Sequence, residues 1–299
     1  MGLIYGLLVA LIWGAQPVVA SFGYRASLDI FDLTVLRFAV SGLIMLPFFI
    51  RGGVWNAAGI GWRRALVLLL LAGPLYNMVL VGGLHWAPAS HSSLIYPAFT
   101  PLFTSLLAKL MLDKRDGIPI LGLGLLLLGV VIVKAGSILQ PQSATYAQAW
   151  RGDLLFMLAA LMWSFYTVLM RRWNTNPLSV VSVIQVGGLL YVPVYFFFAG
   201  TALFQLDARA IAVQAVYQGL LVSVVSVLLF NLAVKQLGAK ASMFTALMPI
   251  VGVSLAIIVL GETLTLSLLL GAMLISGGLF LSLRPGNWQK DESRRPLKN

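Results

Sequence analysis

The run ALVLLLLAGPLYNMVLVGGL, residues 65–84, holds twenty residues without one charged side chain. A helix of about twenty apolar residues is long enough to cross the roughly 30 Å hydrocarbon core of a bilayer. Similar runs recur along the 299-residue chain, of which 60% is hydrophobic and only 10% charged. Ordinary soluble domains do not have this composition. The sequence therefore predicts a protein that is embedded in the lipid bilayer.

The apolar runs and the polar breaks between them predict an all-α integral membrane protein with ten transmembrane helices. The runs lack the alternation of a membrane β-barrel, and an open strand in lipid would leave its backbone unpaired. The predicted spans are residues 3–21, 31–50, 65–84, 90–111, 117–135, 153–171, 178–199, 210–233, 239–260 and 264–283.

The basic residues predict the orientation of these spans. With ten spans, fifteen of the twenty Lys and Arg residues fall on the side that carries both termini, four fall on the other side, and Arg37 lies within a span. Cytoplasmic loops of membrane proteins are enriched in Lys and Arg. We expect a bacterial inner-membrane protein with both termini in the cytoplasm.

The two halves of the sequence resemble one another at a nearly constant separation. Trp13 corresponds to Trp163 and Pro101 to Pro249, with shifts of 150 and 148 residues. A repeat of five spans is odd, so its second copy enters the membrane from the opposite side, as in many carriers. We expect inverted five-helix repeats at residues 1–135 and 151–284, a linker at 136–150 and a basic cytoplasmic tail at 285–299.

Several classes of protein are disfavoured by the residues that the chain lacks or misplaces. The net charge of +11 resides in short connections between spans, which argues for topology and against nucleic-acid binding. There is no cysteine, no H-E-x-x-H motif and no pair of acidic residues inside a span. His85 and His91 are spaced so that they do not share a helix face. We expect no catalytic residue, no metal site and no cofactor.

Short motifs spread over nearly the whole chain resemble the drug/metabolite transporter superfamily. They are Leu11-Ile12-Trp13-Gly14-Ala15, Leu36-Arg37-Phe38, Pro88-Ala89-Ser90, Pro101 and Leu260-Gly261-Glu262. The pattern is similar to the ten-helix EamA branch, and YddG-type aromatic amino acid exporters are plausible relatives. This resemblance implies two EamA-like repeats and the export of amino acids or other small metabolites.

Polar and aromatic residues near the middle of the spans predict a substrate pocket. Trp13 and Trp163 lie near the centres of their spans, whereas membrane tryptophans usually collect at the interfaces. Hydroxyl, amide and aromatic groups suit a small zwitterion with an apolar side chain, although hydrogen bonding between helices explains any one of them equally well. The predicted pocket residues are Trp13, Gln16, Asn77, Tyr96, Phe99, Thr100, Trp163, Tyr166, Ser223, Ser226, Phe244 and Met248.

Arg37 lies about six residues inside the predicted span 31–50, away from both of its ends. An isolated cation there costs about 2.5 to 3.5 kcal/mol on insertion scales. We favour snorkelling to the outer interface or an ion pair with Asp32 or Asp29, and the alternative is contact with a substrate carboxylate. Because the acidic residues fall at span ends or beyond, an acidic proton-coupling site is disfavoured.

Helix breakers predict where the spans bend. Pro17, Pro97, Pro101 and Pro249 lie inside predicted spans, where each removes a backbone hydrogen bond, so each is either a hinge or a static kink. Glycines in the fifth and tenth spans are expected to permit close helix packing. They are Gly122, Gly124, Gly129, Gly271, Gly277 and Gly278.

The sequence predicts an exporter of small metabolites, with neutral or aromatic amino acids first, that works by alternating access in facilitated or exchange transport. Alternative substrates are nucleobases, lipids or other small amphiphiles. A channel or a scaffold is the alternative class. A monomer is sufficient, because the pocket forms between the repeats of one chain.

Overall fold

Helices make up all the regular structure of the parts that the computed structural model describes, which are residues 1–112, 120–139, 146–200 and 202–283. In these ranges nine helical segments are long and apolar enough to span a membrane, and Leu266–Ser282 is a shorter apolar helix. The ten predicted spans are therefore all helical. The predicted tail at 285–299 lies outside the described residues.

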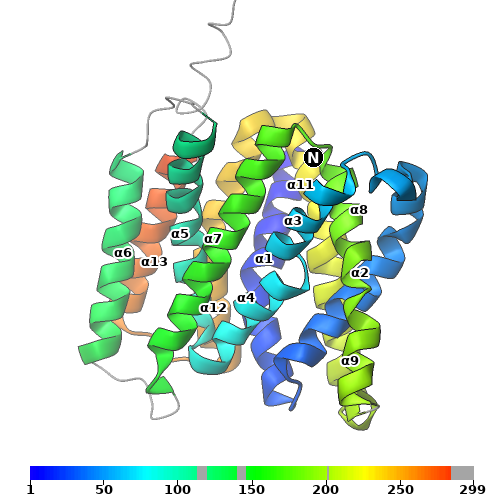
Figure 1. The fold of residues 1–299 in the computed structure, drawn as a ribbon. Helices are drawn as coiled ribbons and strands as arrows, with labels where there is room; N and C mark the ends of the chain where they lie inside the picture. Colours follow the sequence, from blue (N-terminus) through cyan, green and yellow to red (C-terminus); the bar gives the residue numbers. More distant parts are fainter. Residues whose placement is uncertain (113–119, 140–145, 201, 284–299) are drawn as a thin grey trace, which may run out of the picture.

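The first half of the chain folds into six helices (Figure 1). They are α1 (Gly2–Arg25), α2 (Ile30–Gly52), α3 (Trp62–Ala72), α4 (Pro74–Trp86), α5 (Ala89–Met111) and α6 (Ile120–Leu139), with a short 3-10 turn η1 (Val54–Asn56) before α3. Asp29 caps α2, because its side chain accepts from the backbone N–H groups of Phe31 and Asp32.

The second half contains more interruptions. Its helices are α7 (Ala149–Trp173), α8 (Pro177–Gly188), α9 (Tyr191–Ala199), α10 (Ala208–Gln214), α11 (Ser226–Leu237), α12 (Met248–Leu260) and α13 (Leu266–Ser282). A π-helix, η4 (Ala215–Val225), joins α10 to α11, and a 3-10 helix, η5 (Gly238–Leu247), precedes α12. Another 3-10 turn, η3 (Ala202–Gln205), follows α9.

Four predicted spans are thus not continuous α-helices. The span predicted at 65–84 breaks at Gly73, after which Pro74 begins α4 at a position where its missing N–H has no intrahelical partner to lose. The spans at 178–199, 210–233 and 239–260 contain the α8–α9 break, η4 and η5. Pro249 lies inside the apolar segment Lys240–Leu260, as predicted, and occupies the first turn of α12, just after η5.

Helices from the two halves of the chain exchange partners. α1 packs against α11 and α12 of the second half, while α7 packs against α4 and α5 of the first half. α2 pairs with α8, and α6 pairs with α13. In Figure 1, α1 and α7 run in opposite directions between the two ends of the bundle. These reciprocal contacts are those of inverted repeats that share one core.

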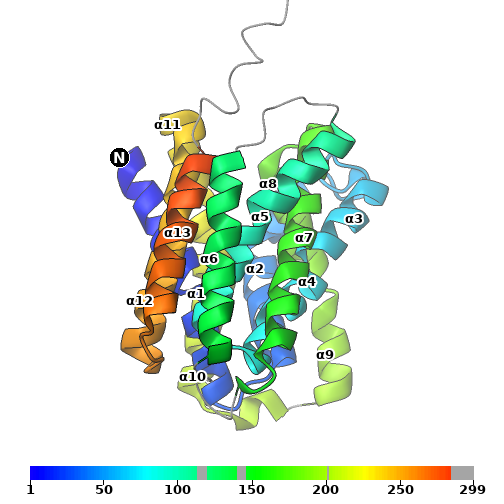
Figure 2. The same ribbon diagram turned by 90° about the vertical axis from the view of Figure 1, so that its left-hand side faces the viewer.

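The α6–α13 pair depends on glycine at its contact points. A Cβ atom on Gly278 would lie 2.8 Å from the Gly122 carbonyl oxygen, and one on Gly129 would lie 3.1 Å from the Gly271 carbonyl oxygen. Two of the six predicted packing glycines, Gly124 and Gly277, face open space instead. Figure 2 shows the start of α1 and the end of α13 at the same end of the bundle, as an even number of crossings requires.

Candidate functional site

Arg37 lies two turns inside α2 and is held by an amide. Its Nη1 donates to Asn77 Oδ1 at 2.8 Å, and Asn77 Nδ2 donates to Thr34 Oγ1 at 2.9 Å. Asn77 is only 1% exposed. It occupies the first turn of α4, so the break at Gly73 brings this side chain up to α2.

The predicted ion pair between Arg37 and Asp29 or Asp32 does not form. Asp29 caps its own helix, while the carboxylate of Asp32 accepts from the Tyr195 hydroxyl and from the Asp29 backbone N–H. Both carboxylates therefore have hydrogen-bond partners at the start of α2. Over the described ranges no acidic side chain forms an ion pair with Arg37, and its Nε is a buried donor without a partner. A half-buried cation with such a buried Nε is costly unless another group neutralises it.

Aromatic side chains from three helices lie beside this arginine. The Tyr76 hydroxyl donates to the Tyr96 hydroxyl at 2.8 Å, and both are within electrostatic reach of Arg37. The ring of Trp163 lies 5.5 Å from that of Tyr76 and 4.8 Å from that of Tyr166. We call Arg37, Asn77, Tyr76, Tyr96, Trp163 and Tyr166 the arginine cluster.

Tyr76 is the member of this cluster that the sequence did not reveal. Asn77, Tyr96, Trp163 and Tyr166 were predicted as pocket residues. For Arg37, contact with a substrate carboxylate was the alternative to snorkelling or an ion pair. The structure therefore brings Asn77, Tyr96, Trp163 and Tyr166 together around Arg37.

A second group of predicted residues surrounds α1. Trp13 Nε1 donates to Ser226 Oγ at 2.7 Å, and the Trp13 ring lies 5.5 Å from that of Phe230. The Phe244 ring packs against Gly6 of α1. A Cβ atom on Gly14 would lie 3.1 Å from the Met248 carbonyl oxygen. No hydrogen bond or ring contact within the described ranges joins this group to the arginine cluster. The two repeat-related tryptophans therefore belong to separate clusters.

Three predicted pocket residues use their polar groups or rings within their own helices. The Thr100 hydroxyl donates to the Tyr96 carbonyl at 2.8 Å, and the Ser223 hydroxyl donates to the Gln218 carbonyl at 2.7 Å. Phe99 packs on Phe103 at 5.6 Å. In this conformation these contacts stabilise helices, and the hinge roles of Pro17, Pro97, Pro101 and Pro249 stay predictions.

Buried glutamines are a feature that sequence reasoning passed over, apart from Gln16. Both amide atoms of Gln218 in η4 lack a partner among the described residues, as does the Nε2 atom of Gln16, and both side chains are at most 7% exposed. Gln185 Oε1 accepts from Ser41 Oγ at 2.7 Å. Gln218 lies in the π-helix η4, and nothing in the sequence indicates this π-helix. Such segments are frequent at functional sites.

At the end of the bundle away from the described termini, Glu262 caps a helix of the other half of the chain. Its carboxylate accepts from the backbone N–H groups of Ala89 and Ser90 at 2.7 and 3.2 Å, so a residue of the second half caps α5 of the first. The His85 ring lies 6.2 Å from the Tyr24 ring and meets the Trp86 ring edge-on at 5.1 Å. No group of three metal-ligating side chains occurs in the part of the chain that the structure describes.

Comparison with known proteins finds a matching family, related sequences and a similar fold. The EamA-like transporter family matches residues 1–135 and 150–284. An uncharacterized transporter of Clostridium kluyveri is 23% identical over 99% of the chain and 96% of its own length. The uncharacterized transporter YoaV of Bacillus subtilis is 23% identical over 92% of the chain and 94% of its own length. A solved crystal structure, 18% identical, shares the fold with a TM-score of 0.62 and covers 94% of this chain and 95% of that one.

Proposed function

Because the chain belongs to the EamA-like transporter family, we propose that this membrane transporter carries small metabolites with a free carboxylate, first of all neutral and aromatic amino acids. Export by alternating access, as facilitated or exchange transport, is part of the proposal. So are a bacterial inner-membrane location with both termini in the cytoplasm and a monomeric working unit.

The observation that carries the proposal is the unneutralised Arg37. Its guanidinium donates to an amide oxygen and keeps its Nε unpaired, and it lies beside the rings of Tyr76, Tyr96 and Trp163. A substrate carboxylate supplies the missing negative charge through charge-assisted hydrogen bonds. The aromatic rings bind an apolar side chain or attract the substrate ammonium.

The interrupted third spans of the two repeats support the same location. The first repeat breaks at Gly73–Pro74, just before Tyr76 and Asn77, and the second contains η4 with the unpartnered Gln218. Broken helices in corresponding positions of two inverted repeats are typical of substrate sites in carriers. An amide such as that of Gln218 suits the ammonium of a zwitterion, because its carbonyl oxygen accepts hydrogen bonds.

Counterflow in proteoliposomes tests the proposal. Vesicles loaded with unlabelled phenylalanine or leucine are expected to accumulate the labelled amino acid, with saturation and trans-stimulation. Replacing Arg37 by Gln is expected to lower counterflow at least about tenfold, because the charge-assisted bonds to the carboxylate are lost. Arg51→Gln is the matched control, since Arg51 is exposed in the last turn of the same helix.

The outcomes separate the alternatives. Transport of the amine analogue phenethylamine at the rate of phenylalanine would show that the carboxylate is not recognised. Flux that neither saturates nor responds to substrate on the far side indicates a channel, and no flux of any amino acid in folded protein removes this substrate class. Loss of counterflow in Arg51→Gln as well as in Arg37→Gln would contradict a specific role for Arg37.

A further inference from the structure

A buried charge network ties the two halves of the chain together near one end of the bundle. His91 in α5 is 3% exposed, and its Nδ1 lies 2.8 Å from Asp153 Oδ1 of α7. The other oxygen of Asp153 forms an ion pair with Lys134 of α6. α5 and α6 belong to the first half and α7 to the second, so the network crosses between the repeats.

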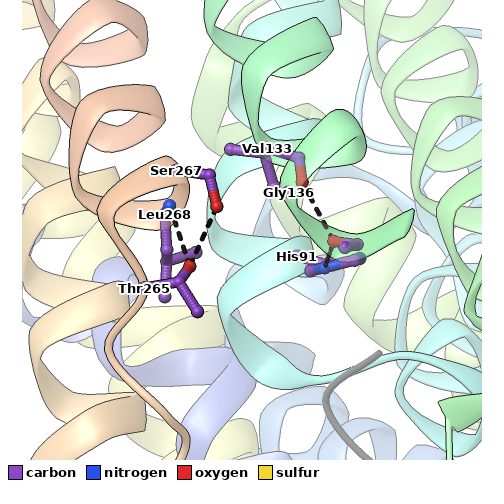
Figure 3. Close-up of a pocket in the computed structure, with 7 residues that line it drawn as sticks. His91, Val133, Gly136, Thr265, Ser267 and Leu268 are labelled. Atoms are coloured by element: carbon purple, nitrogen blue, oxygen red, sulfur yellow. Dashed lines mark hydrogen bonds between the residues drawn. The ribbon is translucent and has the colours of Figure 1, made fainter. Parts of the chain in front are cut away.

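A small pocket borders this network (Figure 3). His91 and Gly136 lie on one side, and Thr265 and Ser267 at the start of α13 lie on the other. Ser137 also lines the pocket. His91 Nε2 lies 3.2 Å from Ser137 Oγ, and the same hydroxyl donates to the Val133 carbonyl at 3.0 Å. Of the two imidazole nitrogens, one therefore faces a carboxylate and the other faces a hydroxyl beside the pocket.

The count of available protons links the charge of His91 to the direction of the Ser137 hydroxyl. The Asp153 carboxylate is paired with Lys134 and accepts, so Nδ1–H donates to it. The Ser137 hydroxyl has one proton, and its bond to Val133 uses it. While the Ser137 hydroxyl donates to Val133, Nε2 can bond to it only as a protonated donor, and His91 is then an imidazolium. When His91 is neutral, the Ser137 hydroxyl turns to Nε2 and leaves Val133.

We propose that His91 is a proton-binding site whose protonated form locks this end of the bundle closed. Opening this end, as the proposed transport cycle requires, parts α5, α6 and α7, which breaks the bonds of His91 and Lys134 to Asp153 and exposes the pocket that His91 and Ser137 line. The imidazolium adds a Coulomb attraction to the Asp153 carboxylate that neutral His91 lacks. When His91 loses its proton, the lock weakens and the end opens more readily.

Other charged or titratable groups around α5 have partners elsewhere. Glu262, before α13, caps α5 at Ala89 and Ser90. Arg25 Nη2 of α1 donates to the Leu260 carbonyl at 2.7 Å. The His85 ring of α4 lies against the rings of Tyr24 and Trp86. Arg151 of α7 lies over the Trp86 ring at 4.8 Å. Of the side chains that face His91 in the described structure, Asp153 and Lys134 are the charged ones, and both are members of the network.

Cysteine accessibility tests the lock without any substrate, because the chain has no native cysteine. The Ser267→Cys variant places a thiol in the pocket wall, and Thr263→Cys places one on the exposed loop at the same end. Both are labelled with a membrane-impermeant maleimide from pH 5.5 to 8. Each rate is divided by the thiolate fraction measured for that cysteine, and the two corrected rates are compared as a ratio. We expect this ratio to rise about threefold or more with pH, as the ion pair between His91 and Asp153 is lost.

Two variants of His91 and its partner make the result specific. In His91→Gln the ratio should not change with pH, since glutamine does not titrate. Ser137→Ala is a conservative second test: it removes the acceptor for Nε2–H, so the midpoint should move to lower pH. A constant ratio in the otherwise native chain, or an unchanged pH response in His91→Gln or in Ser137→Ala, would overturn the proposal. Failed amino acid counterflow beside a normal labelling response would instead overturn only the proposed function.

Discussion

At the scale of single residues, Asn77 determines how the Arg37 guanidinium is held. The amide accepts from Arg37 Nη1 and donates to Thr34, so it positions the cation and leaves its charge unneutralised. A carboxylate in the same place would neutralise Arg37 directly. If the charge of Arg37 is kept for a substrate, a permanent internal carboxylate must compete with that substrate.

The Asn77→Asp variant makes this competition measurable. We expect the thermal unfolding midpoint in detergent to stay level or rise, because a buried cation gains a charge-assisted partner. Counterflow of carboxylate substrates should fall at least about tenfold, since the substrate no longer supplies the missing charge. A folded Asn77→Asp protein that transports amino acids at the native rate would show that Arg37 does not bind the carboxylate.

Asp29 gives a prediction about pH at the start of α2. Burial raises the pKa of its carboxyl, the backbone N–H bonds of Asp32 and Phe31 oppose this, and the charge of Asp32 adds to the rise. A carboxyl whose pKa is higher in the folded than in the unfolded state stabilises the fold below the unfolded pKa of about 3.9. That contribution is lost as pH rises through the folded pKa, so ionised Asp29 is unfavourable at neutral pH.

Replacing Asp29 by Asn keeps an equally good N-cap but removes the charge. We expect the Asp29→Asn variant to unfold at a higher temperature than the native chain at pH 7, and the difference to vanish near pH 4. Thermal melts followed by tryptophan fluorescence at both pH values measure it. If the Asp29→Asn variant is destabilised equally at both pH values, this account of the cap is contradicted.

The limits of sequence reasoning are clear at this scale. The position of Arg37 inside a span followed from the apolar run around it, but its partner did not, because the partner depends on how α2 and α4 are rotated. Asp29 and Asp32 were near in sequence and were therefore favoured, whereas Asn77 reaches Arg37 only through the break at Gly73. The buried Gln218 had no signal, because its environment is set by a π-helix.

At the scale of helices, neighbouring glycines in α13 differ in what they face. A Cβ on Gly278 would lie 2.8 Å from the Gly122 carbonyl of α6, whereas no atom lies within 4 Å of a Cβ on Gly277. The sequence predicts both glycines as packing residues. Their surroundings differ because of the rotation of α13 about its axis, and a run of small and apolar residues does not determine that rotation.

Alanine substitutions at these adjacent positions form a matched pair. Gly278→Ala should destabilise the protein by about 1 to 3 kcal/mol, because backbone at the α6 contact must move. Gly277→Ala should be neutral or stabilise by up to about 1 kcal/mol, since alanine favours a helix over glycine. Unfolding midpoints in one detergent compare them. Equal effects would mean that the α6–α13 contact tolerates an added methyl group.

At the scale of the whole molecule, the order of the helices follows from properties that the sequence displays openly. Long apolar runs with few charges mark the ten spans, and the shift between Trp13 and Trp163 marks the repeat. The exchange of α1 and α7 between the halves is a tertiary property and needed the structure. It makes each repeat contribute helices to both clusters of predicted pocket residues, so neither repeat forms them alone.

The orientation of the bundle in the membrane is testable with two single cysteines at opposite ends. Trp55, in η1, is 95% exposed at the end where α1 begins, and Thr263 lies on the exposed loop before α13 at the other end. Fifteen basic residues on the first side predict that this side is cytoplasmic. In intact cells an impermeant maleimide should label Thr263→Cys, and Trp55→Cys only after permeabilisation. The reverse pattern would invert the molecule and place the His91 lock at the cytoplasmic end, while labelling of both from outside would contradict the bundle itself.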